Sequence, residues 1–412
     1  MSIRKRTWTT AKGEQKTAWV VDYVDGKGTR RLKTFTKKKD ADQFAATATV
    51  EVREGVHVAD GASATVKQAG AFWIASAEAA GLERTTVDSY RSHVDLHIVP
   101  FIGETRLTML SIPAVRAFED ELRAGGRSAA MIRKVMVSLG SLLADAQERG
   151  LTARNVVREV RGKRKGGERR QERRQKGKLK VGVDIPTREE VKAIVGALSG
   201  RRWRPLLLTA IFTGLRASEL RGLRWSDVDL DRREVRVHQR ADRFNTIGKP
   251  KSISGERTLP APPIVINALR EWRLICPKRD TGKVDADGKA VMVLDLVFPN
   301  GSGKVEQLNN IVRRGLQPAL VAAGVTIDTG EVDEDGNPVI VAKYKGIHAL
   351  RHFYASWCIN RQEEGGLGLP LKVVQERMGH ASVTMTADVY GHLFPRGDDA
   401  DELARAENAL LG

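Results

Sequence analysis

The stretch TGLRASELRGLRW, residues 213–225, sets the organisation of the C-terminal half of the chain. Gly214 ends the apolar helix that RPLLLTAIF predicts, and Leu220 and Leu223 recur at the spacing of a second, short helix. Arg216 then stands at the start of that second helix. A guanidinium beside unpaired backbone N–H groups favours an anion site, although an isolated arginine there is more often a surface residue.

A predicted β-hairpin follows this helix, formed by EVRVHQR and GKPKSISGERTLP. Lys251 lies near its tip. A flexible loop lysine usually does no more than solvate the surface, but one carried into a phosphate site can protonate a leaving alkoxide. Lys249, two residues earlier, is an alternative for the same role.

The motif HALRH places His348 and Arg351 three residues apart, on one face of a predicted helix. Leu350 and Tyr354 belong to the buried stripe of that helix, and His352 turns away from it and has the weaker claim to a site. A polar pair at the edge of a core is the alternative interpretation.

The stretch GHASVTMTADVYGHL, residues 379–393, offers a further histidine and a tyrosine. His380 follows a predicted helix end at Gly379, and Ser382 caps a short segment that leads to Tyr390. A tyrosine hydroxyl with a pKa near 10 is a poor nucleophile unless positive groups surround it. Tyr390 is therefore either a packed core residue or a phosphate nucleophile activated by the cationic groups above.

The order Arg, Lys hairpin, His-x-x-Arg, Gly-His, Tyr resembles the tyrosine recombinases, the phage lambda-type integrase family, over residues 184–395. One departure is Ala349, where many relatives have Asp or Leu. The resemblance implies two arginines and two histidines on the scissile phosphate, a lysine general acid and a tyrosine nucleophile. These are Arg216, Arg351, His348, His380, Lys251 and Tyr390.

The resemblance further implies a site-specific recombinase of a phage or other mobile element, working through a 3′-phosphotyrosyl intermediate. Its partners would be double-stranded DNA with core and arm-type sites, a DNA-bound homotetramer, a host DNA-bending factor and an excisionase. We expect no cofactor and no metal, since the sequence has no carboxylate cluster for Mg²⁺. A type IB topoisomerase-like enzyme and a non-catalytic architectural DNA-binding protein are the alternatives.

Four segments are expected in a multidomain chain. Residues 1–62 predict a small α+β arm-site domain, and residues 63–160 an all-α, SAM-like core-binding bundle. Residues 161–184 predict a basic linker, and residues 185–412 a mainly α (α+β) catalytic domain with a small β-hairpin sheet and a C-terminal tail. Two polar stretches, PKRDTGKVDADGKA and DTGEVDEDGNPVI, are expected to be loop insertions, and no repeat of fixed period is visible.

Particular residues mark the elements of the first two segments. TAWVVDYV and RRLKTF predict paired strands around a turn at DGKG, and Thr36 is expected to cap the helix that follows. Ser111 is expected to cap a helix that buries Phe118, and Gly150 to end the next one. Phe72, Trp73 and Ala77 are expected to mark one further helix.

The excess of basic residues indicates what kind of partner the chain binds. Among 412 residues, 69 Lys or Arg outweigh 51 Asp or Glu, giving a net charge of +18 and favouring a polyanion. Residues 161–180 alone hold eleven Lys or Arg and two Glu. Two cysteines make no disulfide framework and no zinc site, and neither a signal peptide nor a membrane span is visible. We therefore expect a cytoplasmic, nucleoid-associated protein of a bacterial host.

Overall fold

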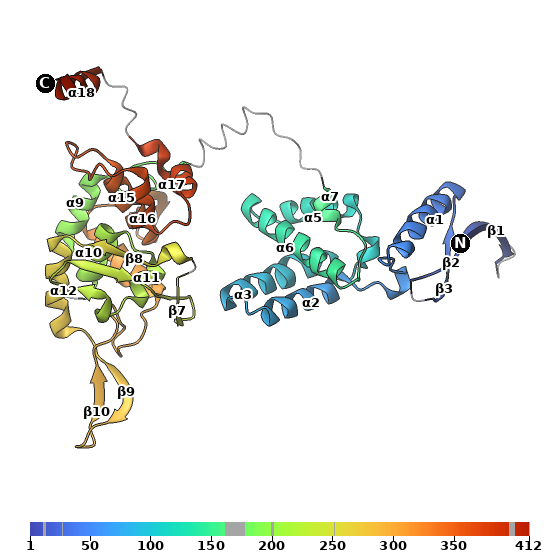
Figure 1. Ribbon diagram of the computed structural model, residues 1–412, viewed down its shortest axis with the longest axis horizontal. Helices are drawn as coiled ribbons and strands as arrows, with labels where there is room; N and C mark the ends of the chain where they lie inside the picture. Colours follow the sequence, from blue (N-terminus) through green and yellow to red (C-terminus); the bar gives the residue numbers. More distant parts are fainter. Residues whose placement is uncertain are drawn as a thin grey trace. The chain divides into compact units, whose positions relative to one another are not determined.

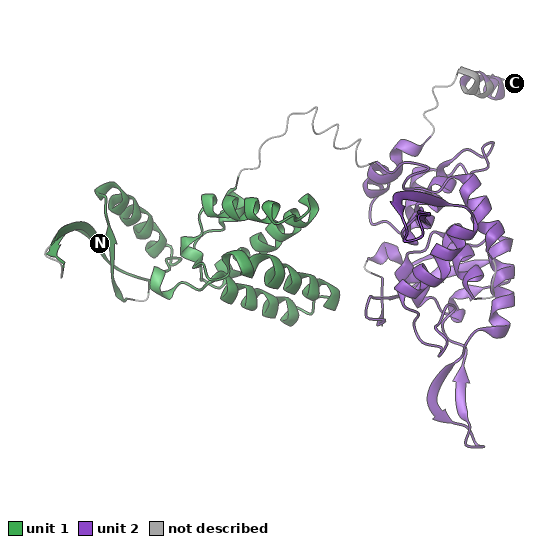
Figure 2. Ribbon diagram, turned by 180° about the vertical axis from the view of Figure 1, so that it is seen from behind, with its two compact units in different colours: residues 1–164 green, residues 165–412 purple. Residues whose placement is uncertain are grey.

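The computed structural model describes residues 1–10, 14–26, 28–160, 178–198, 202–250, 252–394 and 400–411. The chain forms two compact units, Met1–Arg164 and Lys165–Gly412 (Figure 2). Lys251 and most of the expected basic linker lie outside the described residues. No helix of the described ranges is both long and apolar enough to cross a membrane.

Unit 1 begins with an antiparallel sheet covered by one helix (Figure 1). The elements are β1 (Ser2–Thr9), β2 (Gln15–Val24), β3 (Arg30–Phe35) and α1 (Lys38–Arg53). The strands pair in the order β1-β2-β3, and Val21 and Tyr23 of β2 pack with Ala41 and Ala45 of α1. The predicted β2–β3 hairpin is present. The prediction that Thr36 caps this helix is wrong. Helix α1 begins one residue later than a Thr36 cap requires, and Lys37 occupies the N-cap position without a side-chain hydrogen bond.

The rest of unit 1 is helical, as expected, and has its own hydrophobic cluster. Its helices are α2 (Val66–Ala79), α3 (Arg84–His93), α4 (Val99–Ile102), α5 (Ile112–Ala124), α6 (Ala129–Glu148) and α7 (Val156–Glu159). Ser111 caps α5 by accepting from the N–H of Ala114, and Phe118 is buried. Gly150 follows α6 with φ 67°, which ends that helix. The helix predicted from Phe72, Trp73 and Ala77 is α2; Trp73 and Ala77 are buried in it, whereas the Phe72 ring is exposed and lies next to the Arg149 guanidinium.

Unit 2 is mainly helical and wraps a three-stranded antiparallel sheet of order β4-β5-β8. Its helices are α9 (Arg188–Ala197), α10 (Trp203–Thr213), α11 (Ala217–Gly222), α12 (Pro263–Ile275), α13 (Leu308–Asn310), α14 (Gln317–Ala322), α15 (His348–Ile359), α16 (Leu371–Met378), α17 (Val383–Tyr390) and α18 (Ala400–Leu411). The sheet strands are β4 (Val228–Asp229), β5 (Glu234–Val237) and β8 (Arg257–Pro260). Helix α10 is buried on nearly every side and contacts α12 and α15, so it forms the centre of the unit.

The predicted hairpin is formed by the antiparallel pair β5 and β8, with β6 (Arg240–Ala241) and β7 (Ile247–Gly248) as a second small ladder between them. The two polar insertions are not loops. They form the hairpins β9 (Arg279–Val284) with β10 (Ala290–Val293) and β11 (Thr326–Val332) with β12 (Pro338–Ala342). The β9–β10 hairpin extends away from the body of unit 2 (Figure 1).

Candidate active site

The first site residue is positioned by a sharp turn between α10 and α11. Gly214 ends α10 with φ 61°, and a Cβ at this position would lie 2.2 Å from the ring of Tyr354. Only glycine fits both the left-handed backbone and this contact. The turn places Arg216 at the N-cap of α11, where its Nη2 donates to the carbonyl oxygen of Gly379 at 2.9 Å.

A buried carboxylate fixes this arginine. Glu219 of α11 accepts from Nη1 of Arg216 at 2.8 Å and from Nη2 of Arg257, the first residue of β8, at 2.9 Å. Burial alone raises the pKa of Glu219, but the hydrogen bond and charge of Arg257, together with the charge of Arg216, outweigh it and lower the pKa to about 2. The carboxylate therefore stays ionised and locks α11 to strand β8.

Arg351 lies at the centre of the cluster. Its side chain, only 2% exposed, extends from α15 and donates to the carbonyl oxygens of Gly214, at 2.6 Å, and Met378. Burial and the charge of Arg216 lower the pKa of Arg351 to about 9, which still leaves it cationic at neutral pH. One guanidinium thus joins the ends of α10 and α16, the two helices that precede Arg216 and His380.

His380 follows Gly379, whose φ of 59° ends α16. The imidazole is buried, its Nδ1 lies 2.9 Å from the hydroxyl oxygen of Thr386, and its ring lies parallel to that of Tyr390 at 6.2 Å. Burial, followed by the charges of Arg351 and Arg216, lowers the pKa of His380 to about 4. The ring is therefore neutral at pH 7.

Tyr390 is the last residue of α17, whose predicted Ser382 cap is present. Its side chain is 2% exposed, and its hydroxyl oxygen lies 2.7 Å from Nδ1 of His352. Burial raises the pKa of Tyr390 to about 12, while the charges of Arg351 and Arg216 act in the opposite direction. The tyrosine is thus buried, as the core alternative predicts, and also lies within the field of two arginines.

The other predicted site residues are His348 and the candidate lysines, and those that the structure describes are exposed. His348 opens α15 and is exposed, with its ring 4.6 Å from that of His352. Although the residue as a whole is exposed, desolvation of its ring, followed by the charges of Arg351 and Arg216, lowers the pKa of His348. Lys249 is exposed next to β7, and Lys251 lies outside the described residues, so the lysine assignment stays a prediction.

Sequence reasoning missed three residues of this cluster. His352 was placed on the outward face of its helix, yet it contacts the tyrosine hydroxyl. Glu219 and Arg257 pair across 38 residues of chain, and no helical or strand period reveals such a contact. One sequence pattern could have identified Glu219. It lies three residues after Arg216, the N-cap of α11, which is the position of the acidic residue in a capping box.

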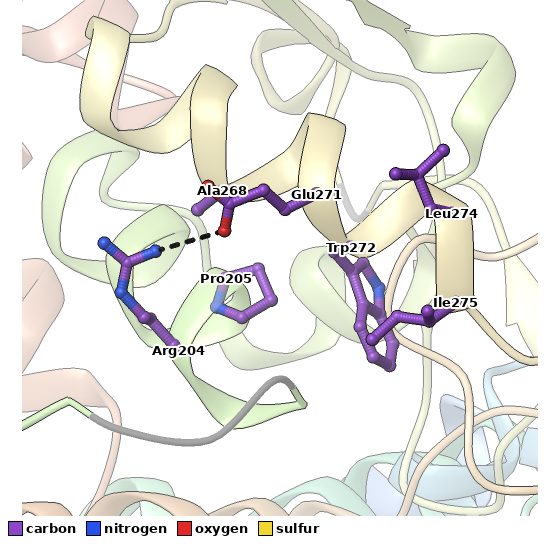
Figure 3. A pocket seen from close by; sticks show the side chains of 7 residues that line it. All are labelled: Arg204, Pro205, Ala268, Glu271, Trp272, Leu274 and Ile275. Carbon is purple, nitrogen blue, oxygen red and sulfur yellow. Dashed lines mark ion pairs between the residues drawn. The ribbon is translucent and has the colours of Figure 1, made fainter.

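A separate cavity of about 380 Å³ lies between α10 and α12 (Figure 3). It is lined by Arg204, Pro205, Ala268, Glu271, Trp272, Leu274 and Ile275. Arg204 and Glu271 face each other at 3.9 Å across it. None of the clustered arginines, histidines or Tyr390 lines this cavity, so we place the candidate active site at the cluster.

A mainly helical unit around a small sheet, with a buried tyrosine among arginines and histidines, is the arrangement expected of the tyrosine recombinase class. A model described as the phage integrase family matches residues 186–396, about half of the chain. The chain belongs to the phage integrase family. This confirms the resemblance predicted from residues 213–225 and 379–393.

Curated relatives agree with this family. The chain is 30% identical over 235 residues to the "Tyrosine recombinase XerC-like" protein of Caldanaerobacter subterraneus subsp. tengcongensis, which covers 53% of each chain. It is also 30% identical over 192 residues to the "Transposase from transposon Tn916" of Enterococcus faecalis, covering 45% of this chain and 41% of the relative. The chain thus spans about half the length of these curated relatives.

Solved structures show the same fold. The Tn1549 transposon integrase in complex with circular intermediate DNA is 20% identical, with a TM-score of 0.55 and coverage of 85% of this chain and 100% of that chain. A lambda integrase dimer bound to a COC′ core site is 16% identical, with a TM-score of 0.54 and 95% coverage of both chains. The expected mixture of helices with small sheets is therefore correct.

Proposed function

We propose that this chain is a site-specific DNA recombinase, the integrase of a phage or other mobile element. The observation that carries the proposal is Tyr390, whose hydroxyl contacts His352 within the field of Arg216 and Arg351. A core tyrosine needs no such surroundings, whereas a phosphate nucleophile needs cationic groups that stabilise its oxyanion and the phosphate it attacks.

In the proposed reaction, the oxygen of Tyr390 attacks a DNA phosphate, and a 3′-phosphotyrosyl bond forms as the bond to the 5′ oxygen breaks. Lys251 gives that leaving oxygen its proton. Arg216 and Arg351 hold the phosphate, while His348 and His380 bond its oxygens and share proton transfer. A 5′-hydroxyl of a second strand then attacks the tyrosyl phosphate and releases Tyr390, so one phosphodiester bond replaces another.

The burial of Tyr390 and its contact with His352 support a movement of α17 before cleavage. Tyr390 is almost fully buried, so a phosphate reaches its hydroxyl only after α17 shifts. His352 is neutral at pH 7, since burial, followed by the charges of His348 and Arg351, lowers its pKa to about 4. The Nδ1 of this neutral imidazole lies 2.7 Å from the tyrosine oxygen, within hydrogen-bond distance. His352 therefore holds the tyrosine hydroxyl in its resting position.

The proposed partner is double-stranded DNA, bound by four copies of the chain. The net charge of +18 favours it, and the structurally similar lambda integrase has been solved as a tetramer bound to a Holliday junction, with a TM-score of 0.52. We propose that residues 1–62 bind arm-type sites and residues 63–160 bind core sites. Recruitment of a host bending factor and an excisionase belongs to the same proposal, as does action on the nucleoid in a bacterial cytoplasm.

A nicked suicide substrate tests the function against its two alternatives. The DNA is taken from the element–host junctions that flank the gene, and a nick next to the cleavage point lets the short 5′ fragment diffuse away. The proposal predicts a trapped covalent complex and, with a second duplex added, joined products. Binding without trapping would support the architectural protein, and trapping without joining would support a topoisomerase-like enzyme.

A further inference from the structure

The two insertion hairpins of unit 2 are near copies of one another. Residues 279–293 read RDTGKVDADGKAVMV and residues 327–341 read IDTGEVDEDGNPVIV, with nine of the fifteen positions identical. The two copies lie 48 residues apart and occur once each, so they add no repeat of fixed period to the chain. We call β9–β10 the first hairpin and β11–β12 the second hairpin.

The copies also fold alike. In the first hairpin, Asp280 lies opposite Met292 and Val284 opposite Ala290. At the equivalent positions of the second, Asp328 lies opposite Ile340 and Val332 opposite Pro338, with a register shift at the same place.

The turns match as well. The carboxylate of Asp285 accepts from the N–H of Asp287 at 3.0 Å and of Lys289 at 2.9 Å, and that of Asp333 accepts from the equivalent N–H groups at 3.0 and 2.8 Å. The two hairpins are therefore one structural module used twice.

The copies differ in charge. The first hairpin has three basic and three acidic residues, whereas the second has five acidic residues and no basic one. The sign of the charge reverses at one equivalent position: Lys283 precedes Val284 in the first hairpin, and Glu331 precedes Val332 in the second. All four of Lys283, Lys289, Glu331 and Glu334 are exposed. Two modules of equal shape thus present complementary charges near their turns.

Both hairpins expose apolar side chains at equivalent positions. Val284 is 68% and Val332 69% exposed, and Met292 and Ile340 are 47% and 59% exposed. Each hairpin is a separate two-stranded sheet, so each described strand has one edge outside its ladder. A two-stranded ribbon is marginally stable alone in water, and open edges with apolar residues favour pairing with another strand.

We propose that the first hairpin of one copy of this chain docks on the second hairpin of a second copy. Strand β9 of the first hairpin pairs with strand β11 of the second along their open edges. Val284 and Val332 then pack on one face of the joined sheet, and Lys283 and Glu331 lie together on the opposite face. Because each copy carries both surfaces, the contact is head-to-tail and can close a ring of copies. DNA is the less suitable occupant for the second hairpin, because its five carboxylates repel phosphates.

Directed cross-linking between two full-length preparations tests this contact. One preparation carries Val284→Cys and the other, with a different tag, carries Val332→Cys; both natural cysteines, Cys276 and Cys358, are buried. A short bismaleimide should give a mixed dimer in greater yield than either preparation gives alone. Absence of the mixed product, or a dominant Val284→Cys homodimer, would overturn the proposal.

A charge swap across the two preparations identifies the contact. Lys283→Glu in the first preparation, or Glu331→Lys in the second, should lower the yield at least about fivefold by placing like charges together. Combining the two variants should restore it. Lys192→Glu and Glu363→Lys, which make the same charge changes at exposed positions outside the hairpins, should leave the yield unchanged. If the combined variants stay low, or the controls lower the yield equally, the hairpins are not the docking surfaces.

Discussion

At the scale of single residues, the site is held by charges that are buried yet paired. Glu219 carries no role in the proposed chemistry, but it ties Arg216 of α11 to Arg257 of β8. Arg257 in turn donates from Nε to the carbonyl oxygen of Arg377, at the end of α16. Removal of the carboxylate would leave two arginines without their shared counter-charge.

We therefore predict that Glu219→Gln destabilises unit 2 by about 3–5 kcal/mol, the usual cost of breaking a buried ion pair from one side. Calorimetry of the full chain measures this as a lower unfolding temperature for that unit. Glu271→Gln is the matched control, since Glu271 is exposed on α12 and its loss should stay within about 0.5 kcal/mol. Equal losses in the two variants would contradict the locking role.

The neutral histidines predict a specific dependence of stability on pH. His352 and His380 have folded pKa values of about 4, below the ordinary 6.5, so the unfolded chain binds more protons between these pH values. Their contribution to stability is complete above pH 6.5 and is lost as the pH falls toward 4.

Each histidine contributes a slope of up to about 1.4 kcal/mol per pH unit within that window. Replacing either one by Asn should flatten the dependence of the free energy of unfolding on pH, measured by denaturant titration between pH 4 and 7. A parent protein whose stability is level across this range would rule out buried neutral histidines.

Residue-scale prediction from sequence succeeded where a role follows from local position. Arg216 at a helix start and Ser382 as a cap follow from neighbouring residues, and the structure has both. His352 was misjudged because its partner, Tyr390, comes from another helix 38 residues later. Contacts of that kind depend on how α15 and α17 pack, which no pattern within one helix specifies.

At the scale of elements, amphipathic helices were predictable and exposed strands were not. Helices α5 and α6 bury their residues at the expected 3.6-residue spacing. Strand β1 and both insertion hairpins are exposed on most positions, so the alternation that reveals a strand is missing. The Asp and Gly residues that form the turns of the two insertion hairpins are visible in the sequence, but both insertions were predicted to be loops.

The hairpin between β5 and β8 carries a prediction about the general acid. Replacing the bridging 5′ oxygen of the DNA by sulfur gives a leaving group that needs no proton. Lys251→Ala should therefore cleave ordinary DNA slowly and the sulfur substrate at near the parent rate, as single-turnover kinetics would show. If the sulfur substrate instead restores cleavage by Lys249→Ala, Lys249 is the general acid.

At the scale of the whole molecule, two units are joined through a strongly basic stretch of chain. If residues 161–180 contact phosphates, replacing their Lys and Arg by Gln should flatten the dependence of log K on log salt. Each lost contact lowers the slope by about 0.9. A Gly/Ser stretch of equal length is the control for tether length and should behave like the Gln variant. An unchanged slope would mean that this stretch does not contact DNA.

The central claim is that Tyr390 is the nucleophile, and identifying the DNA-linked peptide tests it most directly. The complex trapped on the suicide substrate is digested, and the adduct is located by mass spectrometry in the parent and in Tyr390→Phe. The account predicts an adduct on Tyr390 alone, and a phenylalanine variant that folds and binds the same DNA but forms no adduct. An adduct on any other residue, or one that persists in Tyr390→Phe, would contradict it.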